Sequence, residues 1–215
     1  MKITLKSLPD ILATFPEINS SKSIIGFSRS LLATGMLLSL IFNDLNFLIP
    51  ANYLQSLNLH SLKFRFNFFL LFDSSHIVVM QVLAILILIV IISGYYLQVT
   101  SLLHFWISAS LYVLNPVKVG GDNINMMLTL LLIPVCLFDS RKNHWNTPAE
   151  YNKFNQLIQN IFLFIIKLQV AFIYFDSLFD KLHVKEWLNG MMINYWFTHH
   201  FFGLHSKLIT LVAPL

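Results

Sequence analysis

Long apolar runs separated by short polar links dominate this sequence and limit what it can fold into. The strongest run is Ile77 to Leu97, in which Gln81 is the only strongly polar residue before Gly94. A helix needs about 20 mostly apolar residues to cross the hydrocarbon core of a bilayer, and lipid offers no hydrogen bonds to an open backbone. With 56% hydrophobic and 11% charged residues, the chain is predicted to be an all-α integral membrane protein, a multispan helical bundle.

The runs predict about five to six transmembrane helices. Besides Ile77–Leu97, the expected spans are Ile24–Phe42, Leu102–Leu114, Asn123–Phe138 and Leu157–Phe179, with Lys207–Leu215 as the start of a further one. We expect a short break near Gln98–Ser101 between the second and third spans. Two segments fit no simple span: the link Asn43–His76, and Trp187–His200, whose mixture of aromatic and polar residues suits an interfacial or re-entrant element.

The last apolar run reaches Leu215 with no polar flank. We therefore expect residues 1–215 to form a single transmembrane domain that is C-terminally incomplete. Basic residues barely favour either orientation, but span counting places the link around Asn123 and the link after Lys181 on the same membrane side. Arg29 lies only about two turns into the first span, so we expect it to snorkel towards Lys22.

Composition argues against several classes of function. No basic cluster is interleaved with aromatic residues, so nucleic acid is not an expected partner. Cys136 is the only cysteine and lies in an apolar run, where packing is the expected role. The spacing of Asp176, Asp180 and His183, or of the histidines at 199, 200 and 205, permits a metal site. No recognised ligand motif is present, so no metal is assigned.

A stripe of polar side chains follows the fifth span in steps of seven residues. Its members are Lys153, Asn160, Lys167, Tyr174 and Lys181. Seven residues return a helix to nearly the same face, and charge at membrane depth is costly unless it faces protein or a wet cavity. The stripe should therefore face the bundle, with Asp176 and Asp180 on a neighbouring face.

The third span and the link after it carry a second polar set. His104, Ser108 and Asn115 follow helical spacing, and Asp122 and Asn123 come after Gly120-Gly121, where Asp122 can cap the next helix. We expect Lys181, Tyr174, Asp122 and Asn123 to be catalytic. His104, Ser108, Asn115, Lys167, Asp176 and Asp180 are expected to line or support their pocket. Alternatively, these groups only hold helices together by hydrogen bonds.

Four motifs in order resemble the HTTM membrane domain, and more closely the family of the sporulation-delaying protein B. They are "SRSLLATGMLLSLIFN", "LNPVKVGGDNIN", "FDSRKNHW" and "QVAFIYFDSLFDKLHVKEWLNG". The resemblance runs from about Ser28 to Gly203. It implies a protein that works with partner proteins in producing a secreted peptide toxin.

The HTTM domain is shared with vitamin K-dependent gamma-glutamyl carboxylase, whose catalytic lysine lies in a Tyr-Phe…Lys-Leu…Trp context. Tyr174-Phe175, Lys181-Leu182 and Trp187 are similar to that context, which implies that Lys181 is the equivalent base. Where the carboxylase uses a histidine, this chain has Asp122-Asn123. That difference argues against quinol chemistry of the vitamin K type. The cofactor is therefore not assigned, and a quinone or quinol is one candidate.

Three hypotheses follow. The first is a multi-pass protein of the cytoplasmic membrane that is needed to mature a secreted antimicrobial peptide toxin, by enzymatic action on the peptide through an intramembrane pocket. Its partners would be the toxin precursor, another protein of the same toxin system, and membrane lipid. The second is a quinol-linked carboxylase-like enzyme with Lys181 as base. The third is a non-catalytic membrane scaffold or immunity protein.

Overall fold

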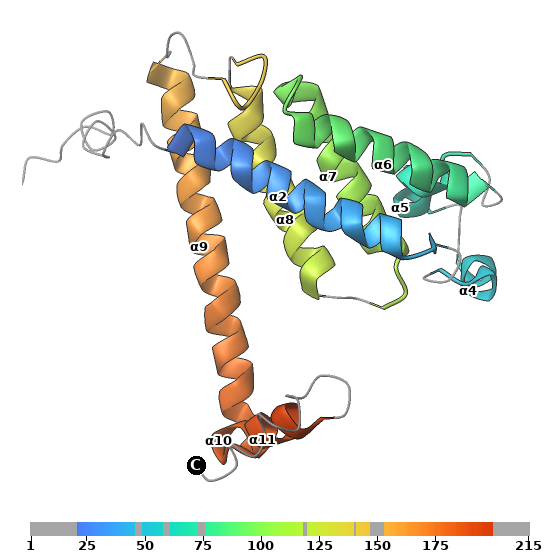
Figure 1. Ribbon diagram of the computed structural model, residues 1–215, viewed down its shortest axis with the longest axis vertical. Helices are drawn as coiled ribbons and strands as arrows, with labels where there is room; N and C mark the ends of the chain where they lie inside the picture. Colours follow the sequence, from blue (N-terminus) through green and yellow to red (C-terminus); the bar gives the residue numbers. More distant parts are fainter. Residues whose placement is uncertain are drawn as a thin grey trace, which may run out of the picture. The chain divides into compact units, whose positions relative to one another are not determined.

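A computed structural model describes residues 21–45, 49–57, 61–72, 76–117, 120–139, 141–146 and 153–199. Helices make up nearly all of this part of the chain (Figure 1). They are α2 (Ser21–Phe42), α4 (Ala51–Ser56), α5 (Leu62–Arg65), the 3-10 helix η1 (Phe68–Leu70), α6 (Ile77–Ser93), α7 (Leu97–Leu114), α8 (Gly120–Leu137), α9 (Lys153–His183), α10 (Lys185–Leu188) and α11 (Met191–Thr198). The chain divides into two compact units, one up to Ile166 and one from Lys167, and each is described by itself.

Four of the described helices, α2, α7, α8 and α9, are long and apolar enough to cross a membrane by length and composition. Helix α6 is almost entirely apolar but has only 17 residues, at the short end of what can span. These helices confirm the predicted all-α multispan membrane protein. The expected run Lys207–Leu215 lies outside the described residues.

The break between the second and third spans lies elsewhere than predicted. Helix α6 ends at Ser93, Gly94 takes a left-handed conformation with φ 87°, and α7 begins at Leu97. The expected break near Gln98–Ser101 is therefore wrong. Thr100 and Ser101 are helical, and the Thr100 N–H donates to the Tyr96 carbonyl oxygen at 3.0 Å. Their hydroxyls do not compete for other partners, because they donate to the carbonyl oxygens of Tyr96 and Gln98 at 2.8 Å each.

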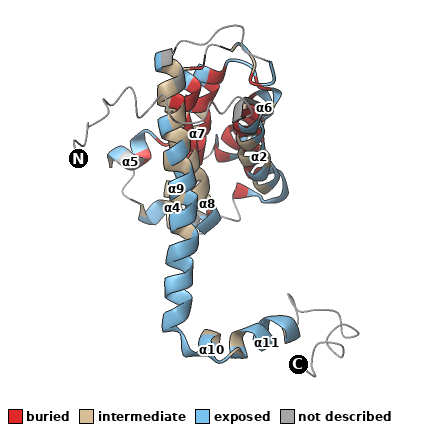
Figure 2. Cartoon of the chain, turned by 90° about the vertical axis from the view of Figure 1, so that its left-hand side faces the viewer, coloured by how far each residue is buried: buried red, intermediate tan, exposed pale blue. Residues whose placement is uncertain are grey.

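The main core of the first unit lies between α2, α6 and α7, where the buried residues concentrate (Figure 2). Ala33 of α2 and Ala84 of α6 are fully buried, and side chains this small let helix backbones approach closely. Gln81, the polar residue of α6, donates to the carbonyl oxygens of Leu40 at 2.6 Å and Asn43 at 2.9 Å. It thereby satisfies acceptors that the end of α2 would otherwise leave open.

The link predicted at Asn43–His76 contains the short elements α4, α5 and η1. Asn67 fastens it to α7, because its amide donates to the carbonyl oxygen of Ser110 at 2.8 Å. The Ser110 hydroxyl in turn accepts from the Phe68 backbone N–H at 2.9 Å. These bonds bring the start of α6 to the end of α7, so the two helices run antiparallel.

Helix α9 confirms the span predicted at Leu157–Phe179 and extends beyond it at both ends, without a break at Lys167 or Gln169. Within the first unit, Phe162 and Ile166 of α9 pack against Ile25 of α2 and Leu132 of α8. In the second unit, the segment predicted to be interfacial begins within α10 and contains α11.

Candidate functional site

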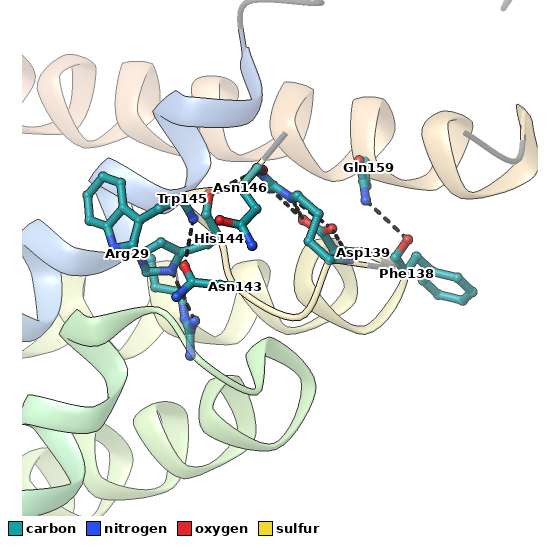
Figure 3. Close-up of polar contacts among 9 residues, drawn as sticks. Arg29, Phe138, Asp139, Asn143, His144, Trp145, Asn146 and Gln159 are labelled. Carbon is teal, nitrogen blue, oxygen red and sulfur yellow. Dashed lines mark hydrogen bonds and ion pairs between the residues drawn. The ribbon is translucent and has the colours of Figure 1, made fainter. Parts of the chain in front are cut away.

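An ion pair links two residues of the 139–146 loop, of which the structure describes all but residue 140. Arg141 Nη2 lies 2.6 Å from Asp139 Oδ2, and both side chains are buried. A second guanidinium nitrogen, Nη1, donates to the carbonyl oxygen of His144 at 2.9 Å. Arg141 Nε also donates to Asp139 Oδ1 at 2.9 Å, so the ion pair is bidentate, and such pairing is geometrically specific. The residues of the motif "FDSRKNHW" therefore form a loop with defined internal contacts, shown in Figure 3.

Two glycines let this loop reach the helices. The His144 N–H donates to the carbonyl oxygen of Gly94, and the Tyr96 N–H donates to that of Lys142, at 3.1 Å each. A Cβ on Gly94 would lie 2.6 Å from Asn143 Oδ1, and one on Gly26 would lie 2.9 Å from His144 Cδ2. The loop is therefore seated against the α6–α7 turn and the first turns of α2.

Arg29 is wholly buried beneath this loop, with 1% of its surface exposed. Its guanidinium donates to Thr100 Oγ1 of α7 and to His144 Nδ1, the latter at 3.4 Å. The expectation that Arg29 snorkels towards Lys22 is wrong. Acceptors from α7 and the loop, both distant from Arg29 in sequence, take the place of water at Nη1 and Nη2, while Nε has no partner among the described residues.

Because a guanidinium can only donate, the bond from Arg29 requires the neutral imidazole of His144 with its proton on Nε2. Nδ1 faces the Arg29 donor, and Nε2 lies 3.3 Å from Ser30 Oγ, whose own hydroxyl donates to the Ile92 carbonyl oxygen. Burial, followed by the nearby guanidinium groups of Arg29 and Arg141, lowers the pKa of His144 to about 4.

The polar row predicted on the third span lies on a buried face of α7. His104 and Ser108 are 2% and 3% exposed, and Thr100 continues the row one turn earlier. No hydrogen-bond partner of His104 Nε2 is found among the described residues. At the far end of α7, Asn115 Nδ2 donates to Asp122 Oδ2 at 3.2 Å, so the structure brings these two predicted residues together.

A pocket of about 300 Å³ opens between α2, α7 and α8. It is lined by Ser108 and Asp122, which the sequence predicted, and by Asn125, which it did not. Asn125 lies one turn after Asp122, and this spacing is the signal that could have identified it. Asn123 is exposed and does not line the pocket. Helix α8 begins at Gly120, so Asp122 lies in its first turn and not at the predicted cap position.

The remaining predicted residues belong to the second unit. Lys181 Nζ lies 4.9 Å from the ring centre of Trp187, a cation–π contact. Lys167, Tyr174, Asp176 and Asp180 lie on α9, and no neighbour within this unit covers them. No group of three possible metal ligands occurs among the described residues. That the polar stripe faces protein, and that Lys181 comes near Asn123, stay predictions.

Long apolar helices, a polar row buried along α7 and a pocket that reaches Asp122 define a multispan membrane protein with a polar interior. Over 222 residues the chain is 33% identical to the sporulation-delaying protein SdpB of Bacillus subtilis strain 168, a match that spans 100% of this chain and 66% of SdpB. The chain is a homologue of SdpB, and the predicted resemblance to that family is confirmed.

A second relative is the uncharacterized protein YitO of the same strain, 28% identical over 98% of this chain and 69% of YitO. The chain thus spans about two thirds of the length of the curated relatives it matches. No family model and no solved structure matches it. The relationships to the HTTM domain and to the carboxylase therefore stay predictions.

Proposed function

We propose that this chain is a multi-pass protein of the cytoplasmic membrane that takes part in producing a secreted antimicrobial peptide toxin. The observation that carries the proposal is its similarity to SdpB over the full length of this chain. The helices long enough to span a membrane are consistent with work on a peptide at the bilayer. Its partners would be the toxin precursor and another protein of the same system.

We further propose that the chain acts on the peptide chemically. In this proposal Asp122 and Asn123 contact the peptide. Lys181 and Tyr174 transfer a proton during the reaction on the peptide. His104, Ser108 and Asn115 support the first pair, and Lys167, Asp176 and Asp180 support the second. The pocket at Asp122 supports this proposal, as does Lys181, which has no carboxylate within ion-pair distance among the described residues.

A non-catalytic role is favoured for one part of the polar interior. Arg29 bonds to both Thr100 and His144, and all three side chains are buried, so Arg29 joins α2 to α7 and to the 139–146 loop. Buried polar groups that only connect helices are common in multispan proteins. We therefore place the proposed peptide contact at Asp122 and the proposed proton transfer at Lys181, and we assign Arg29, Thr100 and His144 to the scaffold.

The test is genetic complementation with a chemical readout. The gene is deleted from its host, and the mature secreted peptide is measured by mass spectrometry with and without the restored gene. We expect the peptide to disappear on deletion and to return with the gene. Secretion that continues undiminished in the deletion strain would overturn the proposed function.

A further inference from the structure

The pocket between α2, α7 and α8 combines an apolar body with a polar end. Apolar side chains come from α2 and α7, among them Leu32, Met36 and Leu111. The polar end is made by Asp122 and Asn125 in the first turns of α8. A volume near 300 Å³ is at the small end of ligand-binding pockets.

At the polar end, the oxygen atoms of Asp122 and Asn125 accept fewer hydrogen bonds from the described residues than they could. Among the described residues, the Asp122 carboxylate receives one hydrogen bond, from Asn115, and no cation lies within ion-pair distance of it. Asn125 Oδ1 is buried and has no hydrogen-bond donor there, while Asn125 Nδ2 lies 3.7 Å from Met36 Sδ. Leaving a buried acceptor unpaired is costly, so a ligand that brings donors would gain from filling this end.

The mouth of the pocket is lateral. Leu31 and Gly35 of α2 and Gly121 of α8 line it and are exposed within the first unit. Gly35 lies near the middle of the Ile24–Phe42 span, so this side of the pocket is at membrane depth. A Cβ added at Gly35 or Gly121 would meet no atom within 4 Å. Within the first unit, a ligand that approached from the lipid phase would therefore meet no side chain at these two glycines.

We propose that this pocket binds an apolar chain that carries a protonated primary amine. The ammonium group donates to the Asp122 carboxylate and to Asn125 Oδ1, and the hydrocarbon lies against α2 and α7. The assignment rests on the proposed function only in naming a peptide as the source, through its N-terminus or a lysine. An aminophospholipid carries the same group, and the experiment separates the two sources.

The probe is octylamine with a photoreactive diazirine in its chain, applied to the chain in lipid nanodiscs, and adducts are mapped by mass spectrometry. The matched probe is the corresponding octanol, which has the same chain and no charge. We expect amine adducts on lining residues of α2 and α7. Asp122→Asn should lower them about tenfold, the effect of losing one charged hydrogen bond.

Two glycine substitutions in the same turn provide a matched control. Gly121→Leu places a side chain in the pocket and should abolish labelling. Gly120→Leu is equally unobstructed but lies outside the lining, so it should label like the parent chain. If Gly121→Leu does not fold, Gly35→Leu blocks the same pocket from α2. Equal labelling by octanol, or full labelling of Asp122→Asn, would overturn the proposal.

Competition identifies the source of the amine. An apolar peptide with a free N-terminus should displace the probe, and its N-acetylated form should not. Displacement by phosphatidylethanolamine alone would keep the amine site and overturn the peptide assignment. These binding results do not depend on toxin secretion. A failed amine site with secretion still lost on deletion therefore overturns only this inference.

Discussion

Arg29 and His144 are 115 residues apart in sequence, yet the arginine Nη1 and the imidazole Nδ1 lie 3.4 Å apart in a hydrogen bond. A guanidinium can only donate, so Nδ1 must be unprotonated for this bond to exist. A proton on Nδ1 would remove the bond and place two cations side by side. Attachment of the 139–146 loop to α2 therefore requires neutral His144.

Acid should loosen this attachment. The pKa of folded His144 is about 4, below its ordinary value of 6.5, because of burial, Arg29 and Arg141, against the opposing effect of Asp139. Between these values the unfolded chain binds a proton that the folded chain excludes. The stabilising contribution is complete above pH 6.5 and is lost as the pH falls towards 4. The measurement is the Tm of the detergent-purified protein across this range.

His144→Gln is the control for that titration, since glutamine keeps a polar side chain and cannot titrate. We expect its Tm to fall less on acidification than that of the parent chain, whatever its stability at neutral pH. The same acid dependence in both proteins would contradict the role given to His144.

Arg29→Lys should destabilise the protein by about 1–3 kcal/mol, because one ammonium cannot reproduce a fork that reaches both Thr100 and His144. Unfolding in mixed micelles measures the change. Arg65→Lys is the matched control, because Arg65 is exposed at the end of α5. A snorkelling arginine would tolerate the same change, so two equally stable variants would argue for snorkelling.

Gly94→Ala should cost about 1–3 kcal/mol from backbone strain, because φ at this position is 87°. The added methyl would also collide with Asn143 and His144 and push the loop away. Gly120→Ala meets no atom within 4 Å and should have little effect. Thermal unfolding and proteolysis of the 139–146 loop report the difference. If the 139–146 loop is cleaved no faster in Gly94→Ala than in the parent chain, its proposed contact with the α6–α7 turn is refuted.

The sequence predicted the fold well where one segment alone decides it. Apolar runs located α2, α8 and α9 because length and hydropathy are local properties. The α6–α7 turn was misplaced because Gly94 lies within a continuous apolar run, and its left-handed conformation depends on the loop packed against it. Thr100 does not indicate a helix break, since its hydroxyl donates to the carbonyl oxygen of Tyr96 one turn earlier.

The site was predictable only in part for a related reason. Helical spacing identified the buried face that holds His104 and Ser108. Asn115 and Asp122 are close in the sequence, which made their contact predictable. The burial of Arg29 could not be predicted, because its partners come from α7 and from a loop more than a hundred residues away. Periodicity along one helix contains no information about such partners.

If this chain matures a secreted peptide through proton transfer at Lys181, as we propose, Lys181→Arg should stop that maturation. Arginine keeps the positive charge and can stack on Trp187, but it does not readily lose a proton. Lys185→Arg, four residues further along, is the matched control. Mature peptide in the medium is measured by mass spectrometry beside the membrane abundance of each variant. We expect no mature peptide with Lys181→Arg at normal membrane abundance, and normal secretion of the peptide with Lys185→Arg. Near-normal secretion with Lys181→Arg would contradict it and leave Lys181 a structural role.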